Sequence, residues 1–122
     1  MTVHAVQRLI GERAVGEPKT ATHGDISVLV GGTGVYVAES VSDTILYVGS
    51  VHRPRDPHGI RSRMREHFRR TGRRQRWVRI TFFPIDADIP HGEILSIEGR
   101  LSILLAPAEG RAWPHVRPAG EQ

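Results

Sequence analysis

The stretch GVYVAESVSDTILYVGS, residues 34–50, decides the expected fold. Residues 35–39 and 44–49 are rich in β-branched and aromatic residues, and the polar connector SVSD separates them. Two such runs so close together predict an antiparallel β-hairpin. Each predicted strand carries one tyrosine near a glycine, Tyr36 in the first and Tyr47 in the second. In a half-buried sheet, tyrosines of this kind are most often packing residues.

The sequence after the hairpin alternates between helical and strand patterns. Residues 59–70 place Ile60, Met64 and Phe68 on one side at a spacing of four, which predicts a helix. Residues 77–83 alternate between apolar and other side chains, which predicts a third strand. A second helix is expected over 93–106 and ends before a proline; its apolar stripe comprises Ile94, Ile97, Leu101, Leu104 and Leu105. The order is ββαβα, an α+β fold with a small three-stranded, mostly antiparallel sheet flanked by helices.

The composition of the segments before and after these elements indicates where the domain begins and ends. We expect residues 1–24 to be an N-terminal appendage that ends in a turn-rich connector, and residues 25–107 to form the domain. The apolar run at 26–30 has a strand-like pattern. Residues 108–122 are a tail rich in Pro, Gly and Arg, with Trp113 as its expected anchor.

The composition limits the class of protein. A length of 122 residues suits one domain, and 39% hydrophobic with 25% charged residues is ordinary globular usage. The absence of cysteine excludes a disulfide scaffold and a thiol nucleophile. The sequence has no apolar run of membrane-spanning length and no signal-peptide pattern at its start. We therefore expect a cytoplasmic protein with no membrane partner.

Positive charge is concentrated in one segment. Arginine supplies 16 of the 17 basic residues, and the formal net charge is +4. Residues 52–79 hold eleven arginines against Asp56 and Glu66, a balance of +9, while the remaining six basic and eleven acidic residues leave −5. This distribution favours a polyanion partner, and the planar arginine fork suits phosphate. The alternative is a solvated arginine face. The expected phosphate contacts are Arg69, Arg70, Arg73, Arg74 and Arg76.

Three polar side chains lie at the edges of the predicted apolar stripes. Arg63 and His67 are four residues apart on the first helix and therefore lie next to each other. They suit phosphate binding and proton transfer, but they also suit a boundary pair that covers the core. Glu98 lies beside the apolar stripe of the second helix, where a carboxylate is costly unless it is paired or bound to metal.

Taken in order, these features resemble the GIY-YIG nuclease family over roughly residues 33–107. GVY at 34–36 and YVG at 47–49 match the paired signature, and RSRMREHF carries Arg63 and His67 at the positions of the family's catalytic arginine and common histidine. Glu98 matches the metal-binding glutamate of the family. The family fold has the same ββαβα order.

The resemblance implies metal-dependent hydrolysis of DNA phosphodiester bonds by an endonuclease, with RNA not excluded, acting as a monomer or homodimer. Glu98 would hold Mg²⁺ or Mn²⁺, and Arg63 would donate to the phosphate. Tyr36 is the family-like general base, His67 is an alternative base, and Tyr47 would position water or phosphate.

The sequence departs from the family pattern in two places. The loop HRPRDPHG at 52–59 is longer than usual, which loops tolerate, and the second departure is more serious. The family commonly carries an Asn after the second helix, whereas this sequence contains no Asn and reads AEGRAWPHVRP at 108–118. His115 and Arg117 are possible substitutes for it. A catalytically impaired nucleic-acid-binding module is therefore one alternative function.

A different nuclease architecture is the other alternative. PID at 84–86 and EGR at 98–100 faintly match the PD-(D/E)xK pattern. That pattern places both elements on adjacent strands and prefers Lys to Arg, whereas EGR falls in a predicted helix.

Overall fold

The computed structural model describes residues 1–70 and 72–109 of the chain. Its centre is an antiparallel sheet with the strand order β1-β4-β2-β3. The strands are β1 (Lys19–Ala21), β2 (Thr33–Glu39), β3 (Ile45–His52) and β4 (Arg79–Pro84). The α+β class is confirmed, but the sheet has four strands where the sequence predicts three.

The predicted hairpin is formed by β2 and β3, with Tyr36 paired to Gly49 and a register irregularity between Ala38 and Glu39. Strand β2 is central, because β4 pairs with its other side and places Phe82 next to Tyr36. Strand β3 lies at an edge of the sheet. Side chains from helices on both faces of the sheet can therefore meet around β3.

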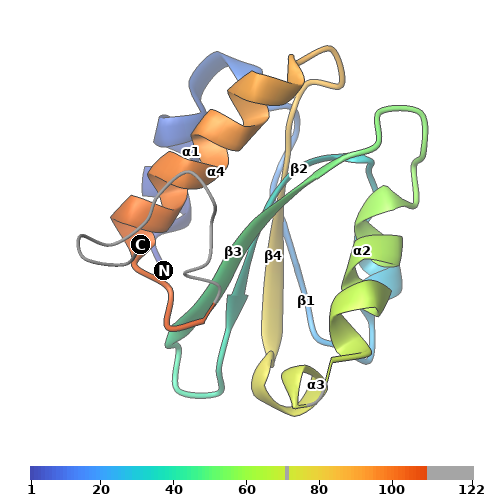
Figure 1. Cartoon of the computed structure of the whole chain (residues 1–122), viewed down its shortest axis with the longest axis vertical. Helices are drawn as coiled ribbons and strands as arrows, with labels where there is room; N and C mark the ends of the chain where they lie inside the picture. The colour runs from blue at the N-terminus through green and yellow to red at the C-terminus, as the bar shows by residue number, and fades with distance from the viewer. Residues whose placement is uncertain (71, 110–122) are drawn as a thin grey trace, which may run out of the picture.

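Helices cover both faces of the sheet (Figure 1). On one face lie α1 (Val3–Ile10) and α4 (His91–Leu105), which contact each other. On the other face lie α2 (Gly59–Phe68) and the 3-10 turn η2 (Ile26–Val28), and the one-turn helix α3 (Arg73–Arg76) contacts α2. A second 3-10 turn, η1 (Gly11–Arg13), follows α1.

The two faces of the sheet have separate apolar cores, as the period of two along a strand requires. Val35, Val37 and Phe83 face α1 and α4 in a core completed by Ile94, Ile97 and Leu101. Tyr36, Ile80 and Phe82 face α2 in a core completed by Ile60, Met64 and Trp77. The predicted stripes of both helices are confirmed, except that Leu104 is 51% exposed.

The N-terminal residues contribute to both cores. Val6 and Ile10 of α1 are buried against the α4 side, and Ala21 of β1 is buried on the α2 side. Residues 1–24, expected to be an appendage, thus supply a helix and an edge strand. The expected strand at 26–30 is wrong, because Ile26–Val28 form a 3-10 turn that packs against α2 and β1.

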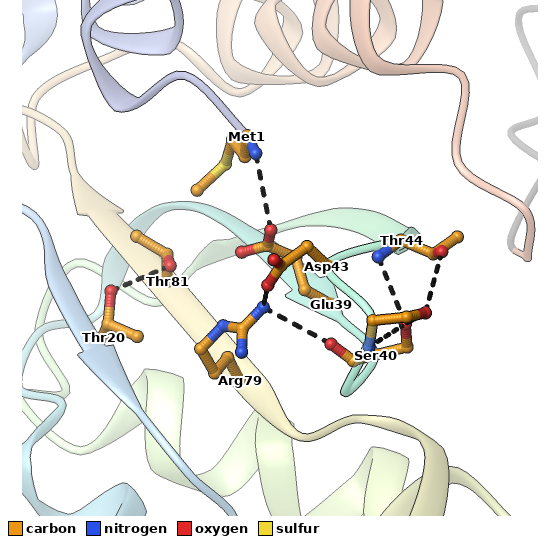
Figure 2. Close-up of polar contacts among 9 residues, drawn as sticks. Met1, Thr20, Glu39, Ser40, Asp43, Thr44, Arg79 and Thr81 are labelled. Carbon is orange, nitrogen blue, oxygen red and sulfur yellow. Dashed lines mark hydrogen bonds and ion pairs between the residues drawn. The ribbon is translucent and has the colours of Figure 1, made fainter.

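Polar contacts hold the end of the sheet where β2 meets the hairpin turn (Figure 2). The Met1 amino group lies 3.6 Å from the buried Glu39 carboxylate. Arg79 pairs with Asp43 in the turn and also donates to the Ser40 carbonyl. The hydroxyls of Thr20 and Thr81 lie 2.9 Å apart across β1 and β4. These contacts fix the chain start and the edge strand to the sheet.

Within residues 1–70 and 72–109, no helix is long and apolar enough to span a membrane.

Candidate active site

Ser50 of the edge strand β3 connects the two sides of the candidate site. Its hydroxyl donates to Glu98 Oε1 of α4 at 2.5 Å, and its carbonyl accepts a 3.4 Å hydrogen bond from an Arg63 NH2 group of α2. Glu98 and Arg63 come from helices on opposite faces of the sheet. They meet because β3 has no neighbouring strand on its outer side.

Tyr36 and His67 form the second pair of the site, with 2.6 Å between the phenol oxygen and Nε2. Tyr36 is 1% exposed and His67 is 8% exposed. Tyr47 lies beside both, with its ring centroid 6.2 Å from that of Tyr36 and 4.9 Å from that of His67. Since Tyr36 pairs with Gly49, the residue before Ser50, this pair adjoins the Arg63–Glu98 pair.

Arg73 contacts the other ring nitrogen of His67, Nδ1, at 2.6 Å. Its guanidinium carbon lies 5.0 Å from the ring centroids of both Tyr47 and Trp77, so the cation is stacked against two aromatic rings. A guanidinium only donates hydrogen bonds, and Nδ1 must therefore be the acceptor. The neutral imidazole then carries its proton on Nε2 and donates it to the Tyr36 oxygen.

These contacts shift the pKa values of the aromatic groups. Burial, together with the nearby Arg73 and Arg63, lowers the pKa of His67 from 6.5 to about 3. Burial raises the pKa of Tyr36 above that of an ordinary phenol, with Tyr47 adding to this and Arg63 opposing it. Burial also raises the pKa of Tyr47, against the effect of Arg73. In the free protein, the imidazole and both phenols are neutral at pH 7.

Arg63 keeps donor capacity for a ligand. Its NH1 group contacts Glu66 at a long 3.3 Å, and the side chain remains 39% exposed. Its Nε is buried and has no hydrogen-bond partner in the described part of the chain.

Glu98 is the residue whose chemistry suits a metal ion here. It is only 9% exposed, which confirms that this side chain faces inward. Among the described residues, no three His, Asp or Glu side chains are grouped as a metal site. A single carboxylate nonetheless fits Mg²⁺, which keeps several waters and takes one or two protein carboxylates together with substrate phosphate oxygens.

The predicted phosphate-binding arginines do not form one surface. Arg69 and Arg70 are exposed, whereas Arg73 is only 13% exposed and is held among His67, Tyr47 and Trp77. Arg76 is paired with Glu109 at 2.7 Å. Arg74 belongs to α3, but its side chain is outside the described part. Trp113, His115 and Arg117 also lie outside the described residues.

Sequence reasoning missed Ser50 and Trp77, and it placed Arg73 only among the outer phosphate contacts. Ser50 follows the YVG signature directly, so its position next to Gly49 was the available signal. Trp77 had none, because its packing against His67 at 4.8 Å between ring centroids depends on how α3 folds back on α2.

The PD-(D/E)xK alternative is contradicted. Glu98, Gly99 and Arg100 lie inside helix α4, and Asp86 follows β4 in a loop where it pairs with Arg13 at 3.2 Å. The two elements of that pattern therefore do not lie on adjacent strands.

No protein-family model, curated protein or solved structure gave a significant match to this chain.

Proposed function

We propose that this protein is a metal-dependent endonuclease of the GIY-YIG type that hydrolyses phosphodiester bonds of DNA. The proposal is carried by one observation, the meeting of two pairs at Gly49–Ser50. Tyr36 and His67 form one pair, and Arg63 and Glu98 form the other through Ser50. A proton-transfer pair beside an arginine and a carboxylate suits attack of water on a phosphodiester.

Each side chain then has a role that follows from its surroundings. Arg63 donates to the phosphate as negative charge develops on its oxygens. Glu98 would hold Mg²⁺ or Mn²⁺, which would stabilise the charge on the phosphate and the leaving oxygen. The contact with the Ser50 hydroxyl fixes the Glu98 carboxylate at the edge of β3.

Tyr36 is better suited than His67 to accept the proton of the attacking water. Both ring nitrogens of His67 are engaged, Nδ1 by Arg73 and Nε2 by Tyr36. Tyr36 can accept this proton only as a phenolate. Burial raises the pKa of the phenol, whereas Arg63 and Arg73 oppose this rise, and the Nε2–H bond would strengthen on the oxyanion. Tyr47, which stacks with Tyr36 and contacts the Arg73 guanidinium, orients the group that binds there.

Plasmid nicking by the purified protein tests the proposal. We expect nicking with Mg²⁺ or Mn²⁺, no nicking with EDTA, and loss of about 10²-fold or more in Glu98→Gln and Tyr36→Phe. Glu93→Gln is the matched control, because it removes the same charge from α4 at a half-buried position where Glu93 contacts Arg13. Nicking by Glu98→Gln at the rate of Glu93→Gln would contradict the role of Glu98.

The same protein samples distinguish the proposed nuclease from the alternative function, a nucleic-acid-binding module without catalysis. It is favoured by the lack of Asn in the sequence and of a three-ligand metal site among the described residues. It predicts no nicking with either metal, together with DNA retention in a gel shift that neither EDTA nor Glu98→Gln changes.

A further inference from the structure

The carboxylate of Glu109 sits among donors from α3 and the residue after it. Arg76 Nε donates to Oε2 at 2.7 Å, and Trp77 Nε1 donates to Oε1 at 3.1 Å. Arg73 Nε lies 4.0 Å from Oε1. Two cations and one neutral N–H therefore converge on one carboxylate. This is also the set of groups that binds the oxygens of a phosphate.

Trp77 requires a hydrogen-bond acceptor at this position. Its side chain is fully buried, and its single polar atom donates to Glu109. A buried indole N–H without an acceptor destabilises the fold, because its lost hydration is not replaced. The position therefore requires an acceptor, which a phosphate oxygen can supply as well as a carboxylate oxygen.

The local charge favours a more highly charged anion than one carboxylate. Residues 69–76 contain five arginines and no acidic residue. Arg69 and Arg70 are exposed, and Arg76 is 49% exposed, so a ligand can approach from solvent. Glu109 neutralises only part of this charge.

Two backbone hydrogen bonds join the segment that carries Glu109 to β3. Ala108 N donates to the Ile45 carbonyl and Glu109 N to the Leu46 carbonyl, both on β3. Ala106, at the end of α4, has a φ of 47°, a left-handed conformation that is unfavourable for a non-glycine residue. Exchange of the Glu109 carboxylate for another anion would therefore disturb little of the core.

We propose that Glu109 occupies a phosphate site formed by Arg73, Arg76 and Trp77, and that a phosphate of the nucleic-acid backbone replaces it when substrate binds. The identity of the ligand rests on the proposed function. Arg73 also contacts His67, and the site is therefore one residue away from the Tyr36–His67 pair. A phosphate bound there would fix the position of the strand relative to Tyr36.

Binding of a short fluorescein-labelled DNA duplex, measured by anisotropy in EDTA at several salt concentrations, tests the replacement. We expect Glu109→Gln to bind about two- to fivefold more tightly, because phosphate no longer competes with a charged carboxylate. We also expect its salt dependence to steepen by about 0.9 in log–log slope, as for one more phosphate contact. Adding Arg76→Ala to Glu109→Gln should remove both gains.

Glu17→Gln is the matched control, because it removes the same charge from an exposed loop before β1. If Glu109→Gln binds no more tightly than Glu17→Gln, phosphate does not replace Glu109. Thermal unfolding of both variants checks that the fold is retained.

A titration with phosphate, monitored by NMR, tests the anion site independently of the proposed function. Inorganic phosphate should shift the indole N–H signal of Trp77 in Glu109→Gln, with Trp113→Phe used to assign it, and should shift it less in the unmodified protein. A shift without any DNA binding would keep the anion site and reject the proposed DNA substrate. DNA binding without a shift would reject the anion site and keep the proposed function.

Discussion

Gly49 lies directly opposite Tyr36 in the β2–β3 pair, and the phenol of Tyr36 occupies the space where a side chain at position 49 would be. A Cβ at Gly49 would lie 2.5 Å from both Cζ and the hydroxyl oxygen of Tyr36. The glycine of YVG at 47–49 therefore makes room for the tyrosine of GVY at 34–36. This gives a packing reason for both residues, whatever the chemistry of the site.

Gly49→Ala should destabilise the protein and displace the Tyr36 phenol. We expect a loss of about 1–3 kcal/mol in the free energy of unfolding, because the ring is buried and cannot move without disturbing the α2-side core. Urea unfolding followed by circular dichroism measures it. Gly92→Ala is the control, since a Cβ there meets nothing within 4 Å and alanine favours the helix by up to about 1 kcal/mol. Equal stability of the two variants would show that the phenol is not confined by position 49.

His67 should make the protein less stable in acid. Its pKa is about 3 in the folded protein, whereas an ordinary histidine in the unfolded chain has 6.5. Between these values the unfolded chain binds a proton that the folded protein does not, so stability falls as the pH is lowered from 6.5 towards 3. The contribution of this one group to the slope is at most about 1.4 kcal/mol per pH unit.

Urea unfolding at a series of pH values measures this effect. We expect His67→Gln to have a shallower pH dependence than the unmodified protein in this range, even though it loses contacts to Tyr36 and Arg73. His4→Gln, which removes an exposed imidazole from α1, should leave the slope nearly unchanged. Parallel curves for all three proteins would exclude His67 as the titrating group.

Arg73 should act on the site as a positioning residue through His67. Arg73→Met removes the donor to Nδ1, and the imidazole can then carry its proton on either nitrogen. Removing the positive charge should also raise the pKa of His67, which Arg73 lowers. If the proposed nuclease activity is present, we expect the nicking rate to fall by about 10²-fold or more and its pH profile to change, as for loss of a tautomer-fixing partner.

Nitrogen-15 NMR of the imidazole provides the readout that a purely structural role would not change. We expect the Nε2-protonated form in the unmodified protein and a mixture of both forms in Arg73→Met. Arg65→Met, which removes an exposed arginine from α2, should retain the Nε2-protonated form and the pH profile. If Arg73→Met keeps a single Nε2-protonated form, another group sets the tautomer.

The sequence by itself determined the helices and strands whose apolar residues recur at a regular spacing. The buried face of α2 is marked by Ile60 and Met64, and that of α4 by Ile94, Ile97 and Leu101. A helix with such an apolar stripe must cover a core. The β2–β3 hairpin follows equally from its alternating β-rich runs and short turn. Even the inward direction of Glu98 is fixed by its place beside that stripe.

Only the tertiary structure decided which polar groups meet. Lys19–Ala21 form a strand because β4 offers an open edge, since three residues have too little period to predict one. Arg73 faces inward because Tyr47 and Trp77, distant in sequence, stack on its guanidinium while His67 accepts its hydrogen bond. Ser50 joins Glu98 to Arg63 because β3 is an edge strand with a helix on each side. The spacing of apolar residues in the sequence indicates which face of a helix or strand is buried. Contacts between helices and strands depend instead on how the buried faces pack together.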